Sequence, residues 1–356
     1  MEGTLVIDKA SVARYLGIIR EIAKSVRLTD SHVHPFDVLY DNCTYEPNPH
    51  VAGVFSAGSA SYEPPAAGTL ELESPAAPAA GAPRDLVDRM LLLTMRRLYA
   101  HTGPQCWLAH ANLAGIGRYV LLPVAQPGRT AETRLAEMVS MFGDDPRFLF
   151  GYSLPNTISA DAVEADIRRA VESYNVAVLK VHPTLSGHDL STNEGLNRIN
   201  ALLQASRKTF LPVILHGGLS PSTRYSAEAC QQGTLENLAK LDLGATDRPI
   251  IIAHAGAFGY EAEELNTKVL SPLNDLLAKY DHLHIGTSAL PAATLGRVLE
   301  RVEPGRIVFG SDALYESSWK AAVKLYWALE RKFSRPEDVF AQIAGTNPEY
   351  LFGKEV

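Results

Sequence analysis

Apolar runs alternate with helix-periodic stretches along most of the chain after residue 117. Seven runs rich in Val, Ile and Leu stand at 118–125, 147–155, 176–183, 212–218, 249–256, 282–290 and 306–313. Helical spacing follows them near 131–142, 160–173, 194–207, 226–241, 260–280, 291–302 and 316–332. Short apolar strands that alternate with helices predict a parallel sheet whose two faces are both buried.

The first part of the chain adds one more strand to this count. Residues 8–26 have the apolar spacing of an amphipathic helix, and a short strand at 27–34 follows, ending in two histidines. Eight strands with intervening helices predict a (β/α)8 TIM barrel, with residues 1–356 as a single domain. An open doubly wound sheet is the structural alternative. The first strand lacks the GxGxxG signature of a nucleotide-binding fold.

Residues 41–115 interrupt the pattern directly after the first strand. Within this insertion, 51–84 is rich in Ala, Gly, Ser and Pro, which predicts a flexible loop or arm, and 85–103 predicts a helix. The loops after the strands of such a barrel lie on its active-site face. The insertion is therefore interpreted either as a lid or dimerisation arm, which makes a homodimer possible, or as an unstructured segment.

Composition excludes several kinds of partner. The 356 residues carry a net charge of −7, without a basic run, which argues against nucleic acid. No apolar run is long enough for a membrane span, and the first residues lack a signal-peptide pattern. The three cysteines, Cys43, Cys106 and Cys230, form no CxxC pair. This usage is typical of a cytoplasmic protein and disfavours a structural zinc knuckle.

The chemistry-bearing side chains stand at the ends of the predicted strands. His32 and His34 close the first strand, and alternation places residues i and i+2 on one face. Lys180 and His182, His216, His254, and Asp312 end the fourth, fifth, sixth and eighth strands. In a parallel barrel these ends meet on one rim, and a divalent metal would give several of these polar groups a partner at once.

This order of residues resembles the amidohydrolase superfamily, in which His-x-His, Lys, His, His and Asp follow one another on strands one, four, five, six and eight. The closer likeness is to the amidohydrolase-related branch, which includes decarboxylases similar to aminocarboxymuconate semialdehyde decarboxylase. The ending GTNPEYLFG at 345–353 is similar to the closing helix motif of that branch. The resemblance covers residues 27–353 apart from the insertion.

The resemblance implies a ligand set and roles. His32, His34, His216 and Asp312 would bind one divalent metal, with zinc expected first and manganese or iron also compatible. Asp312 would move a proton, His254 would orient water or polarise the substrate, and Lys180 would contact substrate. The alternative is a binuclear site in which a carbamylated Lys180 bridges two metals.

Weaker candidates surround this set. His182, Arg224, Tyr315 and Trp319 are predicted to bind substrate or support the site. His188 and the pair His282 and His284 are interpreted as structural, because the first lies in a loop and the others stand at the bottom of the barrel.

Three functions are compatible with these residues. The first hypothesis is a hydrolase, in which activated water cleaves a C–N or ester-like bond of a small molecule. The second is a metal-dependent non-oxidative decarboxylase on the same scaffold. The third is a barrel that binds a metal or small molecule without catalysis.

Overall fold

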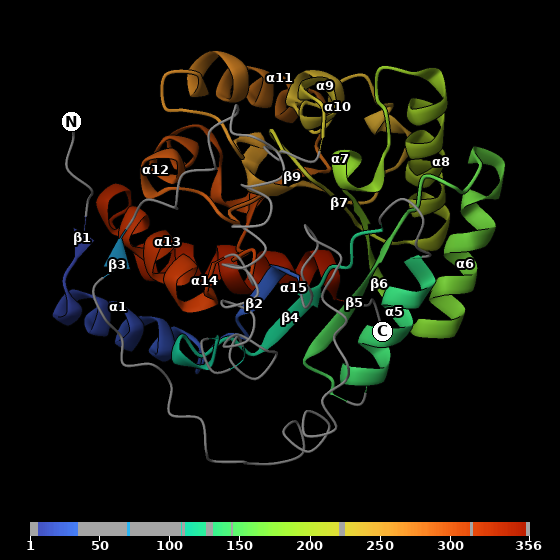
Figure 1. Ribbon diagram of the computed structural model, residues 1–356. Helices are drawn as coiled ribbons and strands as arrows, with labels where there is room; N and C mark the ends of the chain where they lie inside the picture. The colour runs from blue at the N-terminus through green and yellow to red at the C-terminus, as the bar shows by residue number, and fades with distance from the viewer. Residues whose placement is uncertain are drawn as a thin grey trace, which may run out of the picture.

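The computed structural model describes residues 6–34, 70–71, 108, 111–125, 131–143, 145–220, 225–313 and 316–353. Within these ranges an eight-stranded sheet runs in the order β10-β9-β8-β7-β6-β5-β4-β2, and every neighbouring pair in this order is parallel. The strands form the centre and the helices lie outside them (Figure 1). The predicted (β/α)8 fold is thereby confirmed.

The barrel strands are short, and the structure gives their bounds as β2 (Thr29–Val33), β4 (Arg118–Leu121), β5 (Phe148–Ser153), β6 (Val176–Val181), β7 (Val213–Leu215), β8 (Ile250–Ile252), β9 (Leu283–Gly286) and β10 (Ile307–Val308). Each begins within two residues of its predicted start, and each ends earlier than its apolar run. The last apolar residues of each run leave the strand ladder and enter the loops that form the rim.

The helices follow the predicted segments closely. Among the described residues, the α-helices longer than four residues are α1 (Lys9–Ile22), α5 (Ala131–Phe142), α6 (Val163–Tyr174), α8 (Asn193–Thr209), α11 (Ser271–Lys279), α12 (Ala292–Arg301), α13 (Ser318–Lys332), α14 (Pro336–Ala341) and α15 (Asn347–Phe352). Four-residue helices form α7 (Pro183–Ser186), α9 (Ala227–Cys230) and α10 (Leu235–Leu238). The predicted helix 226–241 is therefore two short turns, α9 and α10.

Backbone hydrogen bonds close the barrel between its first and last strands. Ser31 N donates to Phe309 O at 3.0 Å, and Asp312 N donates to His32 O at 2.9 Å. Val33 and Ala313 form an isolated parallel bridge. Helices α1 and α13, which are far apart in the sequence, also lie side by side (Figure 1). Arg14 of α1 forms an ion pair with Glu330 of α13 at 2.8 Å.

Side-chain alternation divides the barrel into an apolar interior and a polar rim. Val120, Val178, Ile214, Ile251 and Val308 share one buried apolar cluster with Leu351 and Phe352 of α15. Asn347 of the same helix donates to the carbonyls of Pro304 and Ile307, where β10 begins, so α15 lies at the N-terminal end of the strands. The opposite, C-terminal end is the one that carries the polar side chains.

Most of the predicted insertion lies outside the described residues, including the predicted helix at 85–103. Its described part includes β3 (Leu70–Glu71), which pairs antiparallel with β1 (Val6–Ile7). Among the described residues, no helix combines the length and hydropathy needed to cross a bilayer.

Candidate active site

Strand alternation brings His32 and Lys180 to the same end of the barrel. Lys180 lies two residues beyond Val178, whose side chain belongs to the interior cluster, so both face inward. His32 and His34 are likewise two apart at the end of β2. All three side chains are nearly inaccessible, with 3% or less of each residue exposed.

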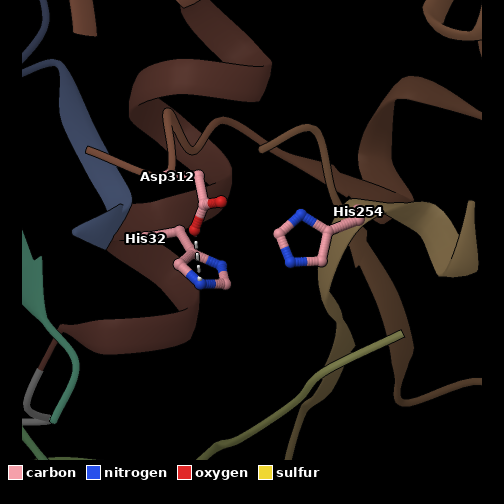
Figure 2. Close-up of side chains that lie close together, drawn as sticks. All are labelled: His32, His254 and Asp312. Atoms are coloured by element: carbon pink, nitrogen blue, oxygen red, sulfur yellow. Dashed lines mark ion pairs between the residues drawn. The ribbon is translucent and has the colours of Figure 1, made fainter. Parts of the chain in front are cut away.

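Three of the predicted ligands converge on one point. His32 Nε2 lies 3.1 Å from His34 Nε2. Asp312 Oδ1 lies 3.3 Å from the first of these nitrogens and 3.4 Å from the second. Figure 2 shows Asp312 directed at His32, with the His254 ring across from both. A ring nitrogen of His254 lies within 4.8 Å of the ligand atoms of His32 and Asp312.

The protonation of these rings favours a bound cation. His34 Nδ1 lies 2.8 Å from the carbonyl of Leu122, which can only accept, so a neutral His34 carries its proton on Nδ1 and a lone pair on Nε2. Burial, and then the nearby Lys180 charge, hold the pKa of His32 well below its ordinary value. Two imidazole nitrogens beside one carboxylate oxygen at this distance match the nitrogen and oxygen donors that a divalent metal takes.

Asp312 and His254 are held by unusual backbone conformations. Asp312 has φ = 71°, and His254 and Ala255 have φ values of 56° and 49°. Left-handed φ is uncommon for residues other than glycine and costs on the order of 1–3 kcal/mol each. Such strain clusters at functional sites, because the fold must hold the residue there against its preference.

Hydrogen bonds from one serine orient two of the histidines. Ser288 O lies 2.9 Å from His254 Nδ1, and Ser288 Oγ lies 3.0 Å from that nitrogen and 3.2 Å from His32 Nδ1. The carbonyl requires a proton on Nδ1 of a neutral His254, which leaves Nε2 as an acceptor. Burial lowers the pKa of His254 to about 4, against the opposing charge of Asp312. The predicted role of His254 as a hydrogen-bond donor to substrate therefore requires it to gain a proton first.

Lys180 is the buried amine of the site. Its Nζ lies 3.3 Å from His32 Nε2. Burial lowers the pKa of Lys180 to about 7, and the Asp312 carboxylate opposes this shift. Burial acts to raise the pKa of Asp312, but the adjacent His34 ring and the nearby Lys180 favour the anion and keep this pKa below its ordinary value.

His216 and His182 form a second pair beside this cluster. Their rings stack 3.9 Å apart and 12° from parallel. His216 Nε2 lies 3.2 Å from both Leu219 O and Ser220 Oγ, while the centroid of its ring is 5.0 Å from that of His254. His182 also accepts from Leu185 N at 3.3 Å and so caps α7. In this arrangement His216 Nε2 bonds within its own loop, and the close three-atom contact involves His32, His34 and Asp312.

Asp30 joins the two strand ends that carry the predicted ligands His32 and Asp312. Its carboxylate accepts from Ser311 N at 2.9 Å, Ser311 Oγ at 2.6 Å and Ser318 Oγ at 2.7 Å. Burial raises the pKa of Asp30 to about 6, against the effect of these hydrogen bonds. The sequence places Asp30 before His32 but gives no sign that its partners stand at the other end of the chain.

A buried ion pair supports the loop that follows Asp312. Glu316 Oε1 lies 2.6 Å from Lys324 Nζ, and the side chains are 14% and 3% exposed. Lys324 also donates to Leu290 O at 2.9 Å, and Glu316 N donates to Asp312 O at 3.3 Å. Neither residue was singled out from the sequence, because a Glu and a Lys eight positions apart give no local signal.

The remaining candidates separate by location. Arg224 and Tyr315 lie outside the described residues. Trp319 is buried in the hydrophobic core on α13, with 4% of the residue exposed. His188 is also buried and its Nε2 bonds to Leu154 O at 3.0 Å. His282 and His284 stand at the start of β9 and bond to backbone carbonyls.

Comparisons with known proteins identify a protein family that the chain matches. A family model described as amidohydrolase matches residues 29–354. The curated proteins contain no significant sequence match.

Solved structures with a similar fold share little sequence with this chain. The IDCase of Metarhizium anisopliae has a TM-score of 0.56 at 14% identity, covering 93% of this chain and 98% of its own. The 5-carboxyvanillate decarboxylase of Sphingomonas paucimobilis has a TM-score of 0.54 at 17% identity, covering 92% and 99%. A dihydroxybenzoic acid decarboxylase of Polaromonas sp. JS666, solved with manganese and the inhibitor 2-nitroresorcinol, has a TM-score of 0.53 at 15% identity, covering 79% and 95%.

Proposed function

This chain belongs to the amidohydrolase family, and we propose that it is a metal-dependent decarboxylase that removes carbon dioxide from a small carboxylated molecule. The observation that carries the proposal is the charge of the site. Lys180 is fully buried beside His32, and Asp312 is the carboxylate that favours its charged form. A metal dication together with this lysine outweighs one carboxylate, so the site is complementary to an anionic substrate.

The proposed metal site uses His32, His34 and Asp312, with His216 and His254 as the histidines next to it. A divalent metal bound there would act as a Lewis acid on a substrate oxygen. Zinc and manganese both accept such donors, and manganese is the metal in the similar dihydroxybenzoic acid decarboxylase. We propose a single metal, with a Lys180 side chain that is not carbamylated. Two metals per chain would support the alternative of a carbamylated, bridging Lys180.

The residues divide the work of decarboxylation among them. The bond between carbon and carboxylate breaks, its electron pair stays on the substrate carbon, and a proton must reach that carbon as carbon dioxide leaves. Lys180 attracts the anionic substrate, and a pKa of about 7 lets it give up a proton near neutral pH. Asp312 stays ionised under the same conditions, because its pKa lies below the ordinary value, and cannot supply that proton.

The similar structures support this choice of reaction. Both the Sphingomonas and Polaromonas proteins are named as decarboxylases of substituted benzoic acids. We therefore propose a substrate in which the carboxylate is attached to an unsaturated or aromatic carbon, since such a carbon stabilises the electron pair left behind.

Hydrolysis is the second candidate, and one observation favours it. The Nδ1 proton of His254 is directed to Ser288 O, which leaves Nε2 of a neutral ring able to accept a proton from water. In that mechanism the proton that His254 takes from water would pass to the leaving group. The two reactions differ in what they release: carbon dioxide in one, an amine or alcohol in the other.

The experiment is a substrate panel in heavy water. Hydroxylated and methoxylated benzoic acids, with 13C in the carboxyl group, are incubated beside amides and esters of similar size. We expect labelled carbon dioxide, and one deuterium in the product at the carbon that carried the carboxylate. An amine or alcohol released without carbon dioxide would reject decarboxylation and support the hydrolase.

A lysine variant then tests the charge argument. Lys180→Met removes the amine at similar volume, and Lys208→Met is the matched control, because Lys208 is exposed and pairs with Glu164 on the surface. We expect at least a 100-fold loss of decarboxylation in the first variant and none in the second. Activity within a few fold of wild type in Lys180→Met would overturn the proposed role of the charge.

A further inference from the structure

Ser288, in the loop after β9, contacts histidines near the ends of two other strands, β2 and β8. It follows β9 in the loop Thr287–Ser288 and is fully buried. Its hydroxyl is 3.2 Å from Nδ1 of His32, at the end of β2, and 3.0 Å from Nδ1 of His254, after β8. One side chain from the loop after β9 thus contacts both the His32 and the His254 ring, whose centroids lie 5.1 Å apart (Figure 2).

The hydrogen-bond partners of His32 determine which of its ring nitrogens has a lone pair available for a metal. Its Nε2 is the atom near His34 and Asp312, so metal binding requires the ring proton on Nδ1. Among the described residues, Ser288 Oγ is the recorded hydrogen-bond partner of that Nδ1. If the acceptor were lost, the proton could move to Nε2 and bond to Asp312 Oδ1 at 3.3 Å. That tautomer would occupy the metal-facing lone pair.

We propose that Ser288 is a positioning residue that holds His32 and His254 in the tautomer with the proton on Nδ1. The hydroxyl accepts from His32, and the carbonyl of the same residue accepts from His254. Both Nε2 atoms are then left as acceptors, one for the metal and one for a proton or a metal. The inference rests on the proposed function, because it assigns the orientation of that same site.

The backbone around His254 adds to the case for this role. His254, Ala255 and Gly256 have consecutive left-handed φ values of 56°, 49° and 75°. This turn carries the His254 ring out of β8, and the two contacts with Ser288 hold its Nδ1 side. His254 is the first residue of this turn, and the bonds to Ser288, in the loop after β9, orient its ring.

The test compares Ser288→Ala with Thr287→Val. Thr287 is the neighbouring buried hydroxyl, and it bonds to the backbone of Gly310 rather than to a histidine. The first readout is manganese or zinc affinity, measured by competition with a chromophoric chelator. Losing an outer partner of a metal-binding histidine typically weakens binding about 10- to 100-fold. We expect that loss for Ser288→Ala and a change below threefold for Thr287→Val.

The second readout is the tautomer itself, measured without metal. Nitrogen-15 spectra of histidine-labelled protein distinguish a proton on Nδ1 from one on Nε2. We expect Ser288→Ala to move His32 toward the Nε2-protonated form, which a purely structural role would not do. Ser288→Cys keeps a weak acceptor at similar size and is expected to lie between the two, and it serves as the test if the alanine variant does not fold.

The outcomes separate this inference from the proposed function. Unchanged tautomers and unchanged metal affinity in Ser288→Ala would overturn the role of Ser288, even if the wild type binds metal and releases carbon dioxide. If the wild type binds neither manganese nor zinc, the proposed metal site is wrong. The nitrogen-15 spectra of the metal-free protein would still show whether Ser288 determines which nitrogen of His32 carries the proton.

Discussion

Replacing Lys324 by Met should destabilise the protein far more than replacing an exposed lysine. Lys324 Nζ lies 2.6 Å from Glu316 Oε1, and the two side chains are 3% and 14% exposed. Glu316 Oε2 has no hydrogen-bond partner among the described residues, so the lysine is the contact that offsets burial of this carboxylate. Burial already raises the pKa of Glu316.

The magnitude follows from the loss of one partner of a buried pair. Breaking such a pair leaves an uncompensated charge and costs about 3–5 kcal/mol, whereas replacing both partners by neutral groups is often nearly neutral. Lys324→Met should therefore lose about 4 kcal/mol of unfolding free energy. Combining it with Glu316→Gln should recover most of this loss, because the double replacement leaves no uncompensated charge.

The assay is equilibrium unfolding in urea, followed by circular dichroism, for the two single variants and the double variant. Lys24→Met is the control, because Lys24 pairs with Glu21 at 2.8 Å on the surface, where both side chains are about 70% exposed. No measurable change is expected there. A double variant as unstable as Lys324→Met would refute the reasoning, since the cost would then come from lost packing and not from the stranded charge.

Three further predictions concern pH, metal binding and the junction between the strand ends. Burial lowers the pKa of His188 to about 4, so the stability this neutral ring provides is complete above its unfolded pKa near 6.5 and is lost as pH falls toward 4. Wild type should therefore lose about 2 kcal/mol more between pH 7.5 and pH 5 than His188→Gln in urea unfolding, and equal losses would contradict this. Asp312→Asn removes the anionic ligand and should lower both the metal content per chain and the turnover at least 100-fold; elemental analysis with a full complement of metal would reject Asp312 as a ligand. Asp30→Ala leaves the three donors from Ser311 and Ser318 without their acceptor and should cost about 3–5 kcal/mol in urea unfolding, with Ser318→Ala near 1 kcal/mol as the comparison; equal costs would show that the carboxylate does not hold the junction.

The order of strands and helices is predictable from the sequence because burial determines the spacing of apolar residues along each strand and helix. The predicted helix at 131–142 coincides with α5, and the strand predicted from 176 begins at Val176. The ends of the strands are less predictable. The apolar run 249–256 continues past β8, which ends at Ile252, because periodicity reports burial and the left-handed turn at His254 is buried as well.

The candidate site likewise has a part that the sequence predicts and a part that it does not. Residue types at strand ends identify His32, His34 and Asp312, since alternation and the shared rim bring them together. The groups that orient them come from loops, where no period exists. Ser288 and the bonds from Asp30 to Ser311 depend on which loops meet in space, and this is information that local sequence does not carry.

Closure of the barrel has a consequence for the order of events during synthesis. Asp30 and Ser311 are joined although 281 positions separate them, and His32 meets Asp312 across the same seam. Chains emerge from the ribosome N-terminus first and fold as they appear. His32 of β2 is therefore synthesised before the other barrel strands, whereas its carboxylate partner Asp312 follows the last of them, β10. The proposed metal site should therefore form only after β10 (Ile307–Val308) and Asp312 have been synthesised, and fragments truncated before β10 are expected not to retain the metal.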